Sequence, residues 1–148
     1  MTYSFIPYPE IVDIIKRVKN KLQIPVVFLS ASLRYCFQIE SNKNIFTASV
    51  FDFLYLFSNA SYIITSSFHG TAFSLIFNKL FVSIVNGSNK DSRIKDLSEQ
   101  LDVNQYFCME DFNMNIIDQQ IDYEKTNLEI SSYREKSLLF YNNLHSRN

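Results

Sequence analysis

The stretch YIITSSFHGTAFSLIFNK, residues Tyr62–Lys79, joins two apolar segments through a polar turn. The turn holds one of the two histidines and one of the two glycines of the chain. The first segment, SYIITS, is short and apolar, which is typical of a strand buried on both faces. The second, HGTAFSLIFN, is apolar on most sides and predicts a helix packed centrally on a sheet. A buried strand that leads through a turn into a buried helix is typical of an α/β sheet.

Upstream of this stretch, helical and strand patterns alternate in the same way. Pro9 suits the first position of a helix, and apolar residues at helical spacing extend this predicted helix to Leu22. PVVFLSA follows as a short apolar strand, and another short strand is expected near NIFTA. Ser49 and Asp52 resemble a helix-capping pair, so a second helix is predicted from there to about Asn59.

Downstream, LFVSIV predicts a strand, DSRIKDLSEQL an amphipathic helix and VNQYFCM a last strand. A C-terminal helix is predicted over residues 122–146, with Thr126 and Glu129 as its capping box. Its packed side is expected to hold Ile130, Tyr133, Ser137, Tyr141 and Leu144. Buried strands that alternate with helices favour parallel pairing. The sequence therefore predicts a single domain over residues 1–148, an open parallel α/β sheet of the Rossmann type with helices on both faces.

The composition is that of a folded domain. Of the 148 residues, 47% are hydrophobic and 16% aromatic, which is enough for a core. The formal net charge of −1 gives no sign of a nucleic-acid partner. The densest apolar segment, SVFDFLYLF, is too short to span a bilayer and carries Asp52. Since no signal peptide is recognisable either, we expect a soluble, cytoplasmic protein without a transmembrane segment.

The polar turn between the central strand and helix is a candidate anion site. Ligands of open α/β sheets bind at the carboxyl ends of strands, and the first amides of a helix favour an anion. Ser66, Ser67 and Thr71 offer hydroxyl groups, and His69 can donate a hydrogen bond or carry a proton. Gly70 has no Cβ, so a ligand or another backbone can come close. The alternative is a plain helix start in which the histidine bonds a backbone carbonyl, and spacing alone slightly favours it.

A second candidate follows the next predicted strand, in NGSNKDSRIKDL. Lys90, Ser92 and Arg93 stand there near the start of a helix, where a cation opposes the helix dipole unless an anion is bound. The alternative is a solvated basic pair beside Asp91 and Asp96, and the local sequence favours this alternative.

Several other chemistries lack their motifs. The chain has no G-x-S-x-G elbow of a serine hydrolase, no Walker-type phosphate loop and no G-x-G-x-x-G fingerprint. Its two histidines and two scattered cysteines, Cys36 and Cys108, show no metal-ligand spacing. Neither a metal nor a cofactor is expected.

The segment NASYIITSSFHGTAFSLIFNKLFVSI, followed by SRIKDL and LDV, resembles the C-terminal half of the polysaccharide pyruvyl transferase family. Members typically carry A-D-Y-V-x-T-x-S-F-H-G-x-x-F-S-x-x-F, then a strand, S-R-I and a short L-G-L segment. The resemblance covers about Tyr3 to Leu144, and SSFHGTAFSLIF is its specific block. It implies transfer of the enolpyruvyl group of phosphoenolpyruvate to a sugar hydroxyl of a polysaccharide, such as an exopolysaccharide, or of its precursor. It also implies one Rossmann-like lobe of a two-lobed transferase of the GT-B type.

The same resemblance implies roles for the two candidate segments. His69 would contact the phosphoenolpyruvate donor and act as general acid toward its methylene carbon. Ser67 and Phe68 would line the donor pocket, and Arg93 would bind an anionic group of the donor. The further substrate-binding candidates are Ser66, Gly70, Thr71, Lys90 and Ser92.

The chain departs from the family pattern at three points. Some members place an arginine two residues before the histidine, where this chain has Ser67, and Gln105 lies where the family often has another arginine. A full member also has an N-terminal lobe, so this chain is expected to be weakly active or inactive without a separate lobe or partner subunit. Two alternatives therefore stay open, a nucleotide-sugar glycosyltransferase donor lobe and a non-catalytic interaction lobe.

Overall fold

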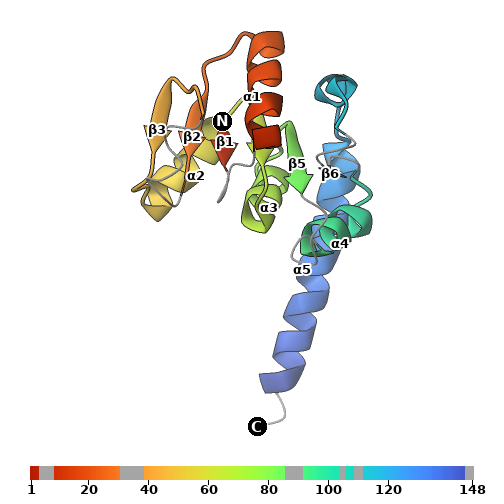
Figure 1. The fold of residues 1–148 in the computed structure, drawn as a ribbon. Helices are drawn as coiled ribbons and strands as arrows, with labels where there is room; N and C mark the ends of the chain where they lie inside the picture. Colours follow the sequence, from red (N-terminus) through yellow and green to blue (C-terminus); the bar gives the residue numbers. More distant parts are fainter. Residues whose placement is uncertain (4–8, 31–38, 86–91, 104–105, 109–111, 146–148) are drawn as a thin grey trace.

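Six short strands pair in parallel into one sheet with the order β3-β2-β1-β4-β5-β6 (Figure 1). The computed structural model describes residues 1–3, 9–30, 39–85, 92–103, 106–108 and 112–145. The strand order reverses between the neighbouring strands β1 and β4. In chain order, the strands are β1 (Thr2–Tyr3), β2 (Val27–Leu29), β3 (Lys43–Ile45), β4 (Ile63–Thr65), β5 (Phe81–Val85) and β6 (Tyr106–Cys108).

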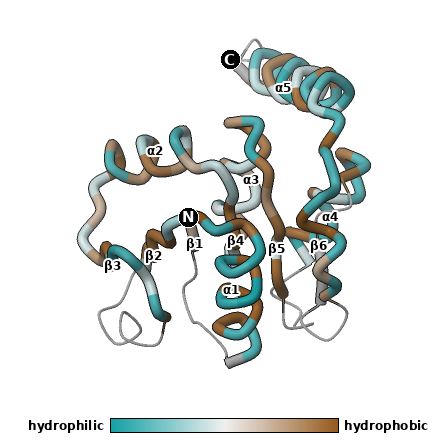
Figure 2. The backbone as a smooth tube through the Cα atoms, turned by 90° about the horizontal axis from the view of Figure 1, so that it is seen from above, coloured by the Kyte–Doolittle hydropathy of each residue, from teal (hydrophilic) through white to brown (hydrophobic). Residues whose placement is uncertain are grey.

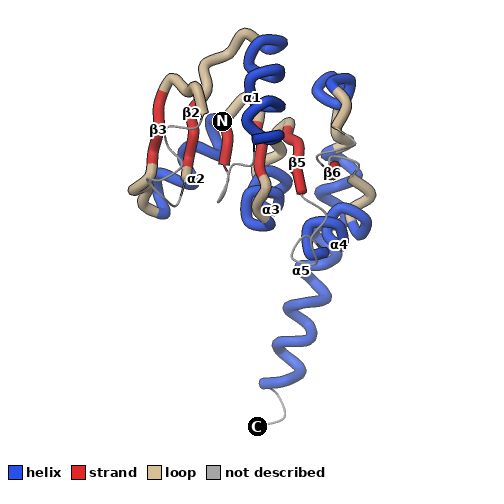
Figure 3. The backbone as a smooth tube through the Cα atoms, in the orientation of Figure 1, coloured by secondary structure: helices blue, strands red, loops and turns tan. Residues whose placement is uncertain are grey.

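A helix lies between successive strands except between β2 and β3, where residues 31–38 lie outside the described part of the chain. Figure 3 shows the helices and strands in blue and red. The predicted α/β fold with parallel strands is therefore confirmed. The strand β1 and the 3-10 helix η4 were not predicted, because segments this short show no periodic pattern. The helices are α1 (Pro9–Leu22), α2 (Val50–Asn59), α3 (Phe68–Ile76), α4 (Ser92–Gln100), η4 (Met114–Asp118) and α5 (Tyr123–His145).

Helices cover both faces of the sheet. On one face, α1 and η4 pack against a core that includes Phe28 and Ile64. On the other face, α2, α3 and the start of α5 pack against a core that includes Leu29 and Ile63. Figure 2 shows α1 and α2 on opposite sides of the strands. Successive residues of β2 and β4 thus enter different cores, which explains why these strands are apolar throughout.

The residues that predict the start of α2 form a complete capping box. The Asp52 amide donates to the Ser49 hydroxyl at 3.1 Å, and the Ser49 amide donates to the Asp52 carboxylate at 3.0 Å. The Ser49 hydroxyl also donates to this carboxylate, at 2.7 Å. The hydroxyl bond, followed by the amide bond, holds the pKa of Asp52 below its usual range because both favour the charged form.

The C-terminal helix predicted over residues 122–146 is present as α5 (Tyr123–His145), but the capping box predicted for its start is wrong. α5 begins at Tyr123, and the Asp122 side chain accepts the Lys125 amide at 3.0 Å, as a helix cap does. Thr126 lies inside the helix, where it is buried and donates its hydroxyl to the Asp122 carbonyl at 2.8 Å. The predicted capping box of Thr126 and Glu129 is therefore not the start of the helix.

Only the first part of α5 packs on the rest of the chain. Ile130 packs against the core that contains α2 and α3. Every side chain from Tyr133 to Leu144 is exposed, so the prediction that Tyr133, Ser137, Tyr141 and Leu144 lie on a packed side is wrong. This exposed half extends past the carboxyl ends of the strands (Figure 1). Within the described part of the chain, neither α5 nor any other helix has the length and apolar character needed to cross a membrane.

Candidate functional site

The two predicted site segments follow β4 and β5, at the carboxyl edge of the sheet. The turn of Ser66 and Ser67 leaves β4 directly after Thr65, and α4 is the next described element after β5. Because β4 lies between β1 and β5, the turn stands beside the point at which the strand order reverses. Ligands of open α/β sheets bind in the crevice outside such a point. The fold therefore places both segments at one edge, in a favourable position for a site.

The contact between Gly70 and Thr65 sets the shape of the turn. The Ser67 amide donates to Thr65 Oγ1 at 3.1 Å, which ties the turn to the end of β4. A Cβ on Gly70 would lie only 2.1 Å from the same Oγ1. The group that comes close to Gly70 is therefore the Thr65 side chain. Gly70 acts here by letting the start of α3 pack directly on β4.

Buried hydroxyl groups hold the underside of α3 on the sheet. Thr71 Oγ1 donates to the Ser67 carbonyl at 3.1 Å and lies 2.7 Å from Ser83 Oγ on β5. Since the Thr71 hydroxyl has one hydrogen, Ser83 is the donor of the second bond. Ser74 donates its hydroxyl to the Gly70 carbonyl at 2.7 Å. Because Thr71 is fully buried and has its hydroxyl engaged, its position favours a structural role for this predicted substrate-binding residue.

Phe68, His69 and Arg93, here called the Phe68 cluster, form the outward-facing part of the site. Phe68 is half-buried and His69 is exposed in the first turn of α3, while Arg93 is exposed in the first turn of α4. The Arg93 guanidinium carbon lies over the Phe68 ring, 5.2 Å from its centroid. The Phe68 and His69 ring centroids are 5.8 Å apart, with the planes at 76°. The structure thus brings the two predicted segments together around one aromatic ring.

The Phe68 cluster has the electrostatic character of an anion site. Among the described residues, no Asp or Glu forms an ion pair with Arg93. Ser67 occupies the N-cap position of α3, yet its side chain makes no capping hydrogen bond. The first amides of α3 and the positive end of its dipole therefore lie at the same edge of the sheet as a guanidinium that has no ion-pair partner among the described residues. Together with the imidazole, these groups can donate hydrogen bonds to a carboxylate or a phosphate.

A family model described as Polysaccharide pyruvyl transferase matches residues 38–89 of the chain. The matched segment runs from before β3 to after β5 and includes the turn with His69. Over these residues the chain is similar to the polysaccharide pyruvyl transferase family. The resemblance to this family that was expected from the sequence is thus confirmed over residues 38–89. Neither the comparison with curated proteins nor that with solved structures gave a match.

The other predicted site residues, in the matched segment and after it, occupy varied positions. Ser66 is half-buried at the end of β4, Ser67 is buried, and Ser92 is exposed at the start of α4. Lys90 and Gln105 lie outside the described residues. Two residues that shape the turn, Thr65 and Ser83, were not predicted. No motif singles them out, because their importance comes from contacts across the helix–sheet interface.

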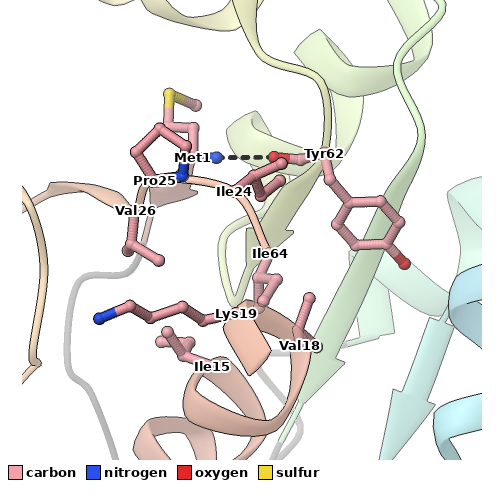
Figure 4. A pocket seen from close by; sticks show the side chains of 9 residues that line it. All are labelled: Met1, Ile15, Val18, Lys19, Ile24, Pro25, Val26, Tyr62 and Ile64. Carbon is pink, nitrogen blue, oxygen red and sulfur yellow. Dashed lines mark hydrogen bonds between the residues drawn. The ribbon is translucent and has the colours of Figure 1, made fainter. Parts of the chain in front are cut away.

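A small cavity lies at the opposite edge of the sheet. It has a volume of about 20 Å³, and its lining includes Lys19, Val26, Tyr62 and Ile64 (Figure 4). Val26 and Tyr62 directly precede β2 and β4, so the cavity lies at the amino ends of these strands. It offers room for about one water molecule, far less than a sugar needs. The described residues also contain no group of three or more His, Cys, Asp or Glu side chains that could hold a metal ion.

Proposed function

We propose that the chain supplies the donor-binding lobe of a transferase that moves the pyruvyl (enolpyruvyl) group of phosphoenolpyruvate to a sugar hydroxyl of a polysaccharide or its precursor. The observation that carries this proposal is the Phe68 cluster. It sets the imidazole of His69 and the guanidinium of Arg93 around one ring at the carboxyl edge of the sheet. His69 lies inside the segment that matches the pyruvyl transferase family.

The chemistry of phosphoenolpyruvate suits these groups. The molecule carries a phosphate and a carboxylate on a three-carbon frame, so it needs hydrogen-bond donors and positive charge on more than one side. Arg93 can bind one anionic group in a bidentate manner, and the first amides of α3 can bind the other. Phosphoenolpyruvate in this position would bring its methylene carbon close to His69.

His69 is proposed as the general acid. When a sugar hydroxyl attacks the central carbon of phosphoenolpyruvate, a new C–O bond forms at that carbon and the electron pair of the double bond takes a proton at the methylene carbon. A protonated imidazole can supply this proton, and the methylene becomes a methyl group. The imidazole, now neutral, can take up the proton that the attacking hydroxyl releases. A second hydroxyl of the same sugar then displaces phosphate and closes the ketal, and its proton leaves with the phosphate. His69 is exposed, so both donor and acceptor can reach it.

The lobe is proposed to be Rossmann-like and to belong to a two-lobed enzyme of the GT-B type. Its parallel sheet has the strand order 3-2-1-4-5-6, which is the order of the doubly wound dinucleotide-binding fold. The position of the Phe68 cluster beside the strand-order reversal agrees with the ligand site of such folds. Residues 1–148 are proposed to form this lobe as a single domain.

A second lobe or partner subunit is proposed to complete the site. Two observations support this proposal. His69 and Arg93 are exposed rather than enclosed, although transferases bind reacting groups in closed clefts. The exposed half of α5 extends past the carboxyl edge of the sheet, the edge at which α3 begins (Figure 1). It carries the exposed residues Leu138, Leu139, Phe140, Tyr141 and Leu144. The chain alone is therefore expected to bind the donor but to catalyse weakly or not at all.

Calorimetric titration with phosphoenolpyruvate and, separately, with a UDP-sugar tests the proposal. We expect phosphoenolpyruvate to bind, and His69→Ala and Arg93→Gln each to weaken the affinity by about tenfold or more, as the loss of a charge-assisted hydrogen bond does. Arg134→Gln is the matched control, because it removes an equal charge from the exposed half of α5 and should leave the affinity unchanged.

Two results would contradict the proposal. Saturable binding of the UDP-sugar without binding of phosphoenolpyruvate would assign the lobe to a nucleotide-sugar glycosyltransferase. Binding of neither compound, by a chain whose thermal unfolding is cooperative, would leave a non-catalytic interaction lobe.

A further inference from the structure

We infer that Phe68 is a positioning residue for Arg93. Its ring holds the guanidinium beside His69, so that the guanidinium and the imidazole can bind the same anion. This inference rests on the proposed function. It gives Phe68 a task other than lining the donor pocket, because the residue acts on the ligand through Arg93.

The Phe68 backbone is held firmly from both sides. Ser67, directly before it, donates its amide to Thr65 Oγ1 at 3.1 Å. The Ser67 carbonyl accepts both the amide and the hydroxyl of Thr71, at 2.9 and 3.1 Å. Close packing of Gly70 on Thr65 fixes the next turn of the helix. The half-buried Phe68 ring therefore projects from a rigid support at the end of β4.

Arg93, in contrast, has little in its own element to hold it. It is exposed in the first turn of α4, where the helix dipole disfavours a cation. Within the described part of the chain, no carboxylate pairs with it. A free arginine side chain samples many rotamers, and fixing it costs entropy each time a ligand binds. A contact that fixes the guanidinium beforehand would lower this cost.

The Phe68 ring provides such a contact. The Arg93 guanidinium carbon lies 5.2 Å from its centroid, within the range of a cation–π interaction. A guanidinium that rests with its face on a ring still presents its N–H groups along the edge, where they can bind an anion in a bidentate manner. The same ring meets His69 edge-on, with centroids 5.8 Å apart. Phe68 therefore contacts both Arg93 and His69, the two side chains proposed to bind the donor.

A double-mutant cycle on phosphoenolpyruvate affinity tests the inference. Phe68→Leu keeps apolar bulk but removes the aromatic face, and we expect it to weaken binding about two- to fivefold, the worth of one exposed cation–π contact. Phe68→Tyr restores the face and should restore the affinity. In an Arg93→Gln background, Phe68→Leu should have no further effect, because the residue through which it acts is absent.

A second measurement does not depend on binding. Protons above an aromatic ring are shifted in NMR spectra, so the Arg93 side-chain resonances should move in Phe68→Leu and return in Phe68→Tyr. Phe112→Leu is the matched control, because Arg17 lies over the Phe112 ring at 5.9 Å, in a contact on another part of the sheet. This variant should move the Arg17 resonances and leave those of Arg93, and the phosphoenolpyruvate affinity, unchanged.

The outcomes separate the inference from the proposed function. If Phe68→Leu weakens binding equally with and without Arg93, Phe68 contacts the ligand itself and the inference is wrong while the function stands. If the wild-type chain binds no phosphoenolpyruvate, the function fails and the Arg93 resonances decide the inference alone. Arg93 resonances that do not move in Phe68→Leu would then overturn the inference. Arg93 resonances that move in Phe68→Leu and return in Phe68→Tyr would support the positioning of the guanidinium by the ring.

Discussion

Gly70 packs so closely on Thr65 that a methyl group at position 70 would lie 2.1 Å from the threonine hydroxyl oxygen. Thr65 is itself buried and accepts the Ser67 amide, so it cannot move without releasing the turn. The position of His69 thus depends on its glycine neighbour through packing. This contact explains at the residue scale why a chain with two glycines places one of them directly after a histidine.

Gly70→Ala is expected to destabilise the fold by about 1–3 kcal/mol, as overpacking of a dense interior does. Thr65→Ala removes the clashing oxygen at the cost of the Ser67 hydrogen bond. We therefore expect the double variant to be clearly more stable than the sum of the two single changes predicts. Chemical denaturation of all four proteins measures this coupling. Strictly additive effects, or a neutral Gly70→Ala, would contradict the close packing.

At the scale of elements, the local sequence can predict where a helix starts when the capping hydrogen bonds join residues that are close in the sequence. Ser49 and Asp52 predict the start of α2, and their capping box is complete in the structure. The C-terminal helix shows the limit of such signals, because Thr126 and Glu129 match the same pattern one turn inside α5. Asp122, which lies directly before the first residue of α5, caps the helix instead.

The capping box of α2 predicts a pH-dependent contribution to stability. The pKa of Asp52 is lowered in the folded state, so its contribution is present above the ordinary aspartate value of about 4 and is lost as the pH falls through the lowered folded-state pKa. Asp52→Asn should therefore lower the melting temperature at pH 7. The difference from wild type should narrow below about pH 4.

Thermal unfolding across this pH range measures the effect. Ser49→Ala, which removes the partner of the carboxylate, should cost roughly 2–4 °C at pH 7 and should make Asp52→Asn nearly neutral when the two are combined. A melting-temperature difference between wild type and Asp52→Asn that stays constant from pH 7 to pH 3 would show that the charged cap does not form.

At the scale of the whole molecule, the alternation of buried strands and helices is enough to predict the parallel α/β fold. The sequence also indicates the two site segments, after β4 and after β5. It does not show that they meet, since the contact of Arg93 with Phe68 depends on the neighbouring positions of these strands in the sheet. Likewise, apolar residues at helical spacing do not tell a packed helix from an exposed one, as the second half of α5 demonstrates.

Deletion of residues 134–148 should leave the rest of the fold intact. All side chains from Arg134 to Leu144 are exposed, so their removal is expected to change the melting temperature by less than about 2 °C. Deletion from Tyr123 onward is the comparison, because it also removes the hydrogen bond from the Tyr123 hydroxyl to the Lys79 carbonyl and the buried Thr126. It should lower the melting temperature by several degrees more. Equal losses in the two deletions would show that the distal half of α5 packs on the body.

The most direct test of the central claim, that the carboxyl edge around His69 binds the donor, is a map of amide chemical shifts in the ¹⁵N-labelled chain during titration with phosphoenolpyruvate. We expect that the amides of Phe68, His69 and Gly70 and the side-chain Nε–H of Arg93 move together and saturate, and that His69→Ala weakens the response. Shifts that instead gather around Tyr62 at the amino ends of the strands, or that never saturate, would contradict it.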